Sequence, residues 1–151
     1  KLSKNLNDKI LDIGCNNGRH IRYLNKRGYT NLFGVDVMSA AIEYCRTNSP
    51  SINPNNLNHD LIQRFLFKQE NLSFDITYTI GATIELIHPS FDIISHMCRV
   101  TKEYIFLLIG EDHHAYPRFY RYEIKKNNFE IVDIKLFDDN YNKLLICKRS
   151  N

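Results

Sequence analysis

One short segment of the chain, residues 9–20 (KILDIGCNNGRH), combines the features of a buried strand, a tight turn and a helix start. Its apolar run, residues 10–13, is typical of a strand that is buried on both faces. Gly14 and Gly18 bracket a turn in which glycine permits positive φ and lets a ligand approach the backbone closely. Asn16, between them, also tolerates left-handed geometry. We therefore expect free N–H groups at the start of the following helix to face a ligand over this turn.

A second apolar segment, residues 32–36 (LFGVD), predicts a strand that ends in an acid. If the two strands are parallel neighbours, Gly14 and Asp36 lie at the same edge of the sheet, where Asp36 can accept two hydrogen bonds from a ribose diol. A glycine turn followed by such an acid indicates a nucleoside-binding site. The spacing from Gly14 to Gly18 differs from the G-x-G-x-x-G spacing of dinucleotide-binding turns.

The segment LDIGCNNGRH resembles the first motif of class I S-adenosylmethionine (SAM)-dependent methyltransferases, in which an acid precedes Gly-x-Gly-x-Gly. Asn16 stands where the family most often has the middle glycine, and asparagine is the best substitute at positive φ. The resemblance extends over residues 8–148. It implies an α/β fold: a single Rossmann-like methyltransferase domain over residues 1–151, with 1–8 as a polar lead-in. The expected sheet is mostly parallel and seven-stranded, with a C-terminal antiparallel hairpin and helices on both faces.

The resemblance implies SAM as the cofactor and assigns each chemical part of SAM to different residues. Asp12 and the turn 14–18 would seat the amino-acid part, and Asp36 would bind the ribose. Asp60 would contact the adenine amine and the N–H of Leu61 a ring nitrogen, with helix capping as the alternative role of Asp60. The end of the fourth predicted strand would border the methionine half. The predicted cofactor-binding residues are Asp12, Gly14, Cys15, Asn16, Gly18, Asp36, Val37, Asp60, Leu61, Thr79 and Ile80.

Periodic apolar patterns predict the remaining elements. Helices are expected over residues 18–27, 61–67, 90–100 and 118–127, together with a short helix capped by Ser39. Strands are expected over residues 74–79, 104–109, 129–134 and 143–147, with a short third strand near residue 58. The turn-rich segment 138–140 favours an antiparallel hairpin between the last two strands. Such a hairpin distinguishes the methyltransferase fold from that of the nicotinamide-dependent dehydrogenases.

A polar loop, residues 110–117 (GEDHHAYP), follows the fifth predicted strand at the edge where ligands bind in open α/β sheets. His113 and His114 are the predicted catalytic residues, since a histidine there can take a proton from an acceptor hydroxyl or amine. A metal site and a solvated loop are the alternatives, and the prediction includes no metal. His88, beside Pro89, is interpreted as an exposed loop residue, with catalysis as its alternative role.

The residues around the fourth predicted strand and the last helix bear on the acceptor. No N-P-P-Y-like signature of nucleic-acid or amide methylation follows the fourth strand, where residues 79–82 (TIGA) stand instead. We therefore predict methyl transfer to an oxygen or nitrogen of a small molecule. Residues 118–122 (RFYRY) mix cations with aromatic side chains, which could stack on a base or hold an anionic acceptor. A helix surface that covers the core is the alternative.

Composition limits the other function classes. The net charge of +3 does not by itself indicate nucleic-acid binding, and no apolar run approaches the length of about 20 residues that a membrane span needs. The four cysteines (Cys15, Cys45, Cys98 and Cys147) are far apart, which favours reduced core thiols and a cytoplasmic location over a zinc site or a disulfide. A non-catalytic SAM-binding module and a nicotinamide-dependent oxidoreductase are the alternative functions. The oligomeric state has no signal in the sequence.

Overall fold

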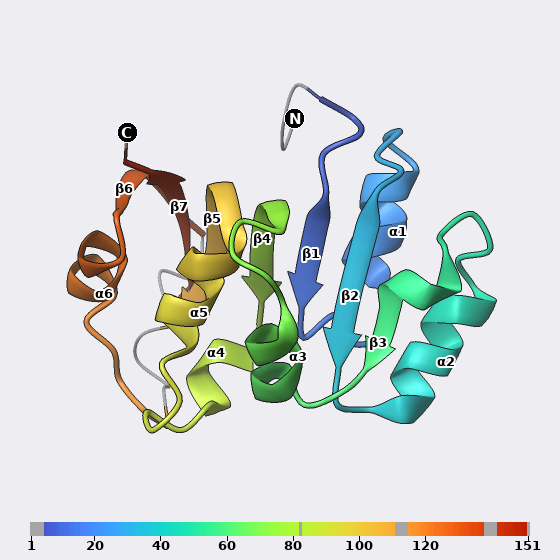
Figure 1. The fold of residues 1–151 in the computed structure, drawn as a ribbon, viewed down its shortest axis with the longest axis horizontal. Coiled ribbons are helices and arrows are strands. Elements are labelled where there is room, and N and C mark those ends of the chain that lie inside the picture. The colour runs from blue at the N-terminus through green and yellow to red at the C-terminus, as the bar shows by residue number, and fades with distance from the viewer. Residues whose placement is uncertain (1–4, 82, 111–114, 138–141, 151) are drawn as a thin grey trace.

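A computed structural model describes residues 5–81, 83–110, 115–137 and 142–150 of the protein, and these residues form a sheet between two helical layers (Figure 1). The strands are β1 (Ile10–Ile13), β2 (Leu32–Asp36), β3 (Leu57–His59), β4 (Phe74–Ile80), β5 (Thr101–Gly110), β6 (Phe129–Leu136) and β7 (Asn142–Arg149). The helices are α1 (Arg19–Asn25), α2 (Ser39–Thr47), α3 (Ile62–Lys68), α4 (Thr83–Leu86), α5 (Ile93–Val100) and α6 (Tyr120–Lys126), with a 3-10 turn, η1 (Pro54–Asn56).

The described strands form one seven-stranded sheet in the order β3-β2-β1-β4-β5-β7-β6. Strands β1 to β5 pair in parallel, whereas β7 runs antiparallel to both β5 and β6. The predicted α/β fold with its C-terminal hairpin is therefore confirmed. In the register of β1 and β2, Ile13 pairs with Val35, so the residues that follow, Gly14 and Asp36, leave the sheet at the same edge.

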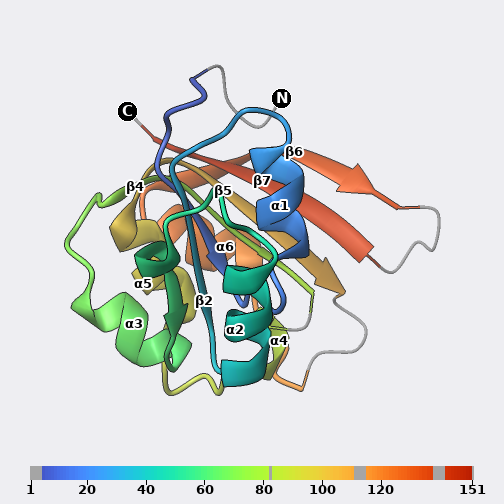
Figure 2. The ribbon, with the colours of Figure 1, turned by 90° about the vertical axis from the view of Figure 1, so that its right-hand side faces the viewer.

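Helices cover both faces of the sheet, and each layer has its own core. Figure 2 shows α3 and α5 on one side of the sheet and α1 and α2 on the other. Leu66, Met97 and Ile124, from α3, α5 and α6, are buried in the first core. Ile21 and Ile42, from α1 and α2, are buried in the second. The β1 strand is buried along its whole length, which explains its unbroken apolar sequence.

Several helix starts differ from the prediction: those expected at residues 18, 61, 90 and 118 lie one to three residues later, at Arg19, Ile62, Ile93 and Tyr120. Ser39 was expected to cap α2, but the N-cap residue is Met38 and no side-chain hydrogen bond caps the helix. The helix expected from residue 90 begins at Ile93, because the Asp92 carboxylate accepts a hydrogen bond of 3.0 Å from the N–H of Ser95 and so caps the helix there.

All four cysteines are free and buried, as predicted. Burial raises the pKa of the Cys147 thiol to about 12, and burial together with the neighbouring Cys147 does the same for Cys98. Both therefore stay protonated and pack as small apolar side chains. None of the helices formed by the described residues has the length and apolar character that a membrane span requires.

Candidate functional site

The turn after β1 has the backbone conformation that its sequence predicts. Gly14, Asn16 and Gly18 have φ angles of 77°, 47° and 75°, all in the left-handed region. A Cβ atom at Gly14 would lie 2.0 Å from the Thr83 hydroxyl oxygen, and one at Gly18 would lie 2.1 Å from the Cys45 sulfur. Both glycines are thus required by conformation and by packing, while the asparagine tolerates its positive φ.

The N–H groups of this turn are already paired within the protein. Those of Gly14 and Cys15 both donate to the Val35 carbonyl, at 2.9 and 3.1 Å, and that of Gly18 donates to the Cys15 carbonyl at 2.9 Å. The Asn16 side chain accepts from the N–H of Asn17 at 2.6 Å. Any free donors at this helix start therefore belong to the first turn of α1, and the glycine turn itself offers shape rather than N–H groups.

Asp36 is the best-positioned polar side chain at this edge of the sheet. Its carboxylate accepts a hydrogen bond of 2.8 Å from the N–H of Asn16 and another of 2.9 Å from the N–H of Met38. The residue is 9% exposed. Because each oxygen is fixed by one backbone donor and keeps a free lone pair, the carboxylate is preorganised to accept two further hydrogen bonds from neighbouring hydroxyl groups.

A cavity of about 580 Å³ opens beside this carboxylate, and we name it the central cavity. Its size suits a nucleoside-sized ligand. Six of the predicted cofactor-binding residues line it: Gly14, Asn16, Asp36, Val37, Leu61 and Ile80. Its other lining residues are Met38, Ile62, Gln63, Gly81, Thr83, Leu86 and Ile87.

Seven lining residues were not predicted from the sequence, and one feature marks two of them, Met38 and Leu86, as it marks the predicted Val37 and Leu61. Four large apolar residues of the cavity are strongly exposed, with Val37, Met38, Leu61 and Leu86 at 54%, 56%, 49% and 67%. Each follows a strand or ends a short helix, where a solvated loop would carry polar side chains. Exposed apolar residues gathered around one cavity indicate a ligand-binding surface. Thr83 had no such signal, because its contact with Gly14 depends on the tertiary fold.

Asp12 lies beneath the turn and does not line the central cavity. It is 1% exposed, and its carboxyl group accepts a hydrogen bond of 2.9 Å from the Tyr78 hydroxyl. Burial and the nearby Asp36 charge raise the pKa of Asp12 to about 7, although the Tyr78 hydrogen bond opposes this shift. The geometry gives Asp12 a supporting position under the turn, and its predicted contact with a cofactor remains a prediction.

Asp60, which precedes α3, is held by two cations of that helix. Its carboxylate makes ion pairs with Arg64 and, at 3.4 Å, with Lys68. Burial alone would raise the pKa of Asp60, but the hydrogen bonds and charges of Arg64 and Lys68 outweigh it and lower the pKa. The capping alternative is wrong, because the N-cap residue of α3 is Leu61 and no side chain caps it. The predicted adenine contact of Asp60 remains a prediction.

Three further predicted residues lie next to the central cavity without lining it. Cys15 is 4% exposed and Thr79 is fully buried, with a hydroxyl that has no partner among the described residues. Gly18 packs against Cys45 below the turn. Their roles in cofactor binding remain predictions.

The predicted catalytic residues His113 and His114 lie outside the described residues. The loop that contains them starts at the carboxyl end of β5, where the Glu85 carboxylate accepts a hydrogen bond of 2.9 Å from the N–H of Gly110. Glu85 belongs to α4, whose last residue lines the central cavity, so the loop begins beside that cavity. His88 is exposed and bonded to Ser90 at 2.9 Å, which agrees with its interpretation as a loop residue.

Comparison with known proteins agrees with this geometry. The family model described as a methyltransferase domain matches residues 10–104, more than half of the chain. No curated protein sequence matches the chain. Magnesium protoporphyrin IX methyltransferase from Synechocystis PCC 6803, solved with bound SAM, is 18% identical with a TM-score of 0.75; the alignment covers 97% of this chain and 72% of that one.

Two further solved structures share the fold. A SAM-dependent methyltransferase from Archaeoglobus fulgidus is 16% identical, with a TM-score of 0.78 over 95% of this chain and 86% of that one. One from Aquifex aeolicus is 13% identical, with a TM-score of 0.71 over 96% and 85% of the two chains. The family match and the sheet with its antiparallel hairpin exclude the nicotinamide-dependent alternative. This chain is a member of the class I SAM-dependent methyltransferase family.

Proposed function

We propose that this protein transfers the methyl group of SAM to an oxygen or nitrogen atom of a small-molecule acceptor. The observation that carries the proposal is the Asp36 carboxylate, which two backbone N–H groups hold at the wall of the central cavity beside the Gly14 turn. This carboxylate suits a ribose diol, and the glycine surface beside it suits a ligand that lies against the backbone.

The other lining residues fit the remaining parts of SAM. Val37, Leu61 and Ile62 offer an apolar surface for the adenine ring, whereas Ile80 and Thr83, with Gly14, border the space for the methionine half. When bound, SAM supplies an already activated methyl group. The residues of this chain therefore need only orient the donor and the acceptor and keep water out, and effects of this kind supply a large part of the rate enhancement in many enzymes.

The acceptor and its proton are the less defined part of the proposal. An acceptor hydroxyl or amine must lose a proton, and His113 or His114 is the proposed base because their loop begins beside the central cavity. Replacing both histidines with glutamine is expected to slow methyl transfer without changing the affinity for S-adenosylhomocysteine (SAH). If the rate is unchanged, the base lies elsewhere or is not needed. We also propose a cytoplasmic location, which four free buried thiols favour.

Calorimetric titration with SAH tests the proposal. The wild-type protein is expected to bind SAH at sub-millimolar concentration. Asp36→Ala should weaken binding by about 1–3 kcal/mol, because it removes two ribose hydrogen bonds and releases the N–H groups of Asn16 and Met38. Asp133→Ala is the control, since this acid lies on β6 and pairs with Lys135 at 2.7 Å. No binding by the wild type, or equal affinity of Asp36→Ala, contradicts the proposal.

Activity separates an enzyme from a non-catalytic SAM-binding module. Incubation with methyl-labelled SAM and pooled small-molecule extracts is expected to yield labelled small molecules. If SAH binds with the expected dependence on Asp36 but no extract of small molecules, protein or nucleic acid becomes labelled, the module is the better description.

A further inference from the structure

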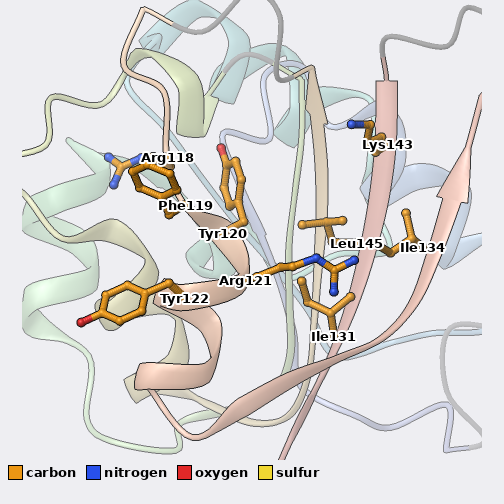
Figure 3. Close-up of a pocket in the computed structure, with 9 residues that line it drawn as sticks. All are labelled: Arg118, Phe119, Tyr120, Arg121, Tyr122, Ile131, Ile134, Lys143 and Leu145. Atoms are coloured by element: carbon orange, nitrogen blue, oxygen red, sulfur yellow. The ribbon is translucent and has the colours of Figure 1, made fainter.

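A second cavity, of about 410 Å³, lies between α6 and the β6–β7 pair, and we name it the α6–β7 cavity (Figure 3). Ile131, Ile134 and Leu145 form its apolar floor, and Phe119 and Tyr120 contribute aromatic carbon. The described residues that line it include the cations Arg118, Arg121 and Lys143 and no acid. An apolar cavity with a few placed polar or charged groups is the usual form of a small-molecule site.

Arg121 is the cation that reaches into this cavity. Figure 3 shows its side chain extending from α6 towards the strands, with its guanidinium group next to Leu145 and Ile131. Within the described part of the chain, Arg121 makes no hydrogen bond or ion pair. By contrast, Arg118 donates to the Ile87 carbonyl at 3.0 Å and lies 3.6 Å from the Glu123 carboxylate. Arg121 therefore keeps five N–H donors for an acceptor that the described residues do not supply.

Lys143 adds a second positive charge at the same cavity. It is the second residue of β7, where it pairs with Ile109 on β5 and with Leu136 on β6. Residues 143 and 145 of this strand point to the same face because side chains alternate along a strand. The Lys143 side chain therefore lies on the same side of the sheet as Leu145. A cation above an apolar floor, such as Arg121, attracts an anion that also carries apolar surface.

We propose that the α6–β7 cavity binds a small organic anion, with its carboxylate, sulfonate or phosphate held by Arg121 and its apolar body on Ile131, Ile134 and Leu145. A guanidinium group presents a planar fork of donors that matches such oxyanions in two-point contact. This site is separate from the central cavity in its lining residues and does not depend on methyl transfer.

Another role for Arg121 is to cover the apolar floor with its methylene stem while its charge stays in water. The two roles differ in what they require of a ligand. A covering arginine gives no preference for an anion, whereas the proposed site needs the charge and the apolar body in one molecule.

Titration with three probes distinguishes these roles. Phenylacetate carries both features, 2-phenylethanol carries only the apolar body, and acetate carries only the charge. Each is added to the full chain while the methyl resonances of Ile131, Ile134 and Leu145 are followed by NMR. We expect saturable shifts with phenylacetate and an affinity at least about tenfold higher than for either partial probe, since a hydrogen bond to a charged group and the burial of a phenyl ring are each worth about that factor.

Two matched variants complete the test. Arg121→Gln is expected to lower the affinity for phenylacetate at least about tenfold, whereas Lys126→Gln, the same charge change on an exposed residue of the same helix outside the cavity, should change it less than about twofold. Both variants should bind SAH as the wild type does, so failure here is distinguishable from failure of the proposed methyl transfer. Absent methyl shifts, equal binding of 2-phenylethanol, or equal losses in the two variants would overturn the proposal.

Discussion

The two cavities of this molecule are built in different ways. In the central cavity the polar group is fixed by the backbone, because the N–H groups of Asn16 and Met38 hold both oxygens of Asp36. In the α6–β7 cavity the charged groups stand on long side chains, and Arg121 has no partner among the described residues. A ligand of the first cavity meets a preorganised site. A ligand of the second must also order Arg121, at a cost of about 0.5–1.5 kcal/mol.

This difference predicts specific, tight binding in the central cavity and weaker, more tolerant binding in the α6–β7 cavity. The two sites also share one structural support. The Arg118 side chain, 5% exposed, donates to the carbonyl of Ile87, which lines the central cavity, while Arg118 itself lines the α6–β7 cavity. The comparison can therefore be tested by replacing three residues. These are Gly14 in the turn of the central cavity, Arg118 as the shared support, and Asp12 below the turn.

The largest effect is expected for Gly14→Ala. The alanine would have to keep a φ of 77°, and its Cβ would lie 2.0 Å from the Thr83 hydroxyl oxygen. Left-handed strain of about 1–2 kcal/mol and overpacking of about 1–3 kcal/mol together predict a loss of about 2–5 kcal/mol in the free energy of unfolding. Because the turn must shift, SAH affinity should fall at least about a hundredfold in calorimetric titration, about 2.7 kcal/mol.

Gly28→Ala is the matched control for Gly14→Ala. Gly28 also has positive φ, 94°, but its Cβ would lie 3.3 Å from a Leu6 methyl group, in a loop that does not line the central cavity. This variant should lose only the strain energy, measured by urea unfolding, and keep its SAH affinity. If both variants bind SAH equally well, the backbone of the turn does not shape the site and the comparison fails.

The shared support gives the next largest effect. Arg118→Met keeps much of the side-chain volume but leaves the Ile87 carbonyl and the Glu123 carboxylate without this partner. Breaking a buried pair in this way predicts a loss of about 3 kcal/mol in the free energy of unfolding. Arg64→Met is the control, because Arg64 is 60% exposed in its pair with Asp60 and its replacement should cost at most about 0.5 kcal/mol. Equal, small losses would show that Arg118 supports neither cavity.

The same contrast explains what the sequence could predict. The fold, the glycine turn and Asp36 depend on short segments and on the rule that parallel strands end at one edge, so they are readable from local pattern. Thr83 against Gly14, and Arg121 above Leu145, depend on segments far apart in the chain that meet only after folding. Residues 118–122 were interpreted either as a site for an anion or as a covering surface, because the sequence does not show which strand lies beneath them. His113 and His114 remain predictions.

The smallest effect concerns Asp12, which tests whether an acid under the turn supports the fold rather than the ligand. Its folded-state pKa is raised from 3.8 to about 7, so the folded protein holds this proton more tightly than the unfolded chain. The stability it contributes is therefore fully present below pH 3.8 and is lost as pH rises through 7. The difference corresponds to at most about 4 kcal/mol, and relaxation of the structure around the buried charge reduces the expected loss to about 2 kcal/mol.

Asp12→Asn removes this titration while its side-chain oxygen can still accept the Tyr78 hydrogen bond. The variant should gain stability over the wild type between pH 5 and pH 8 by about 2 kcal/mol, measured by urea unfolding at each pH. Its SAH affinity should stay within about threefold of the wild type, because the carboxyl group does not line the central cavity. A large loss of SAH affinity with no pH-dependent gain would instead place Asp12 among the ligand contacts. The polar groups that bind the ligand in the central cavity would then include the buried Asp12 as well as Asp36.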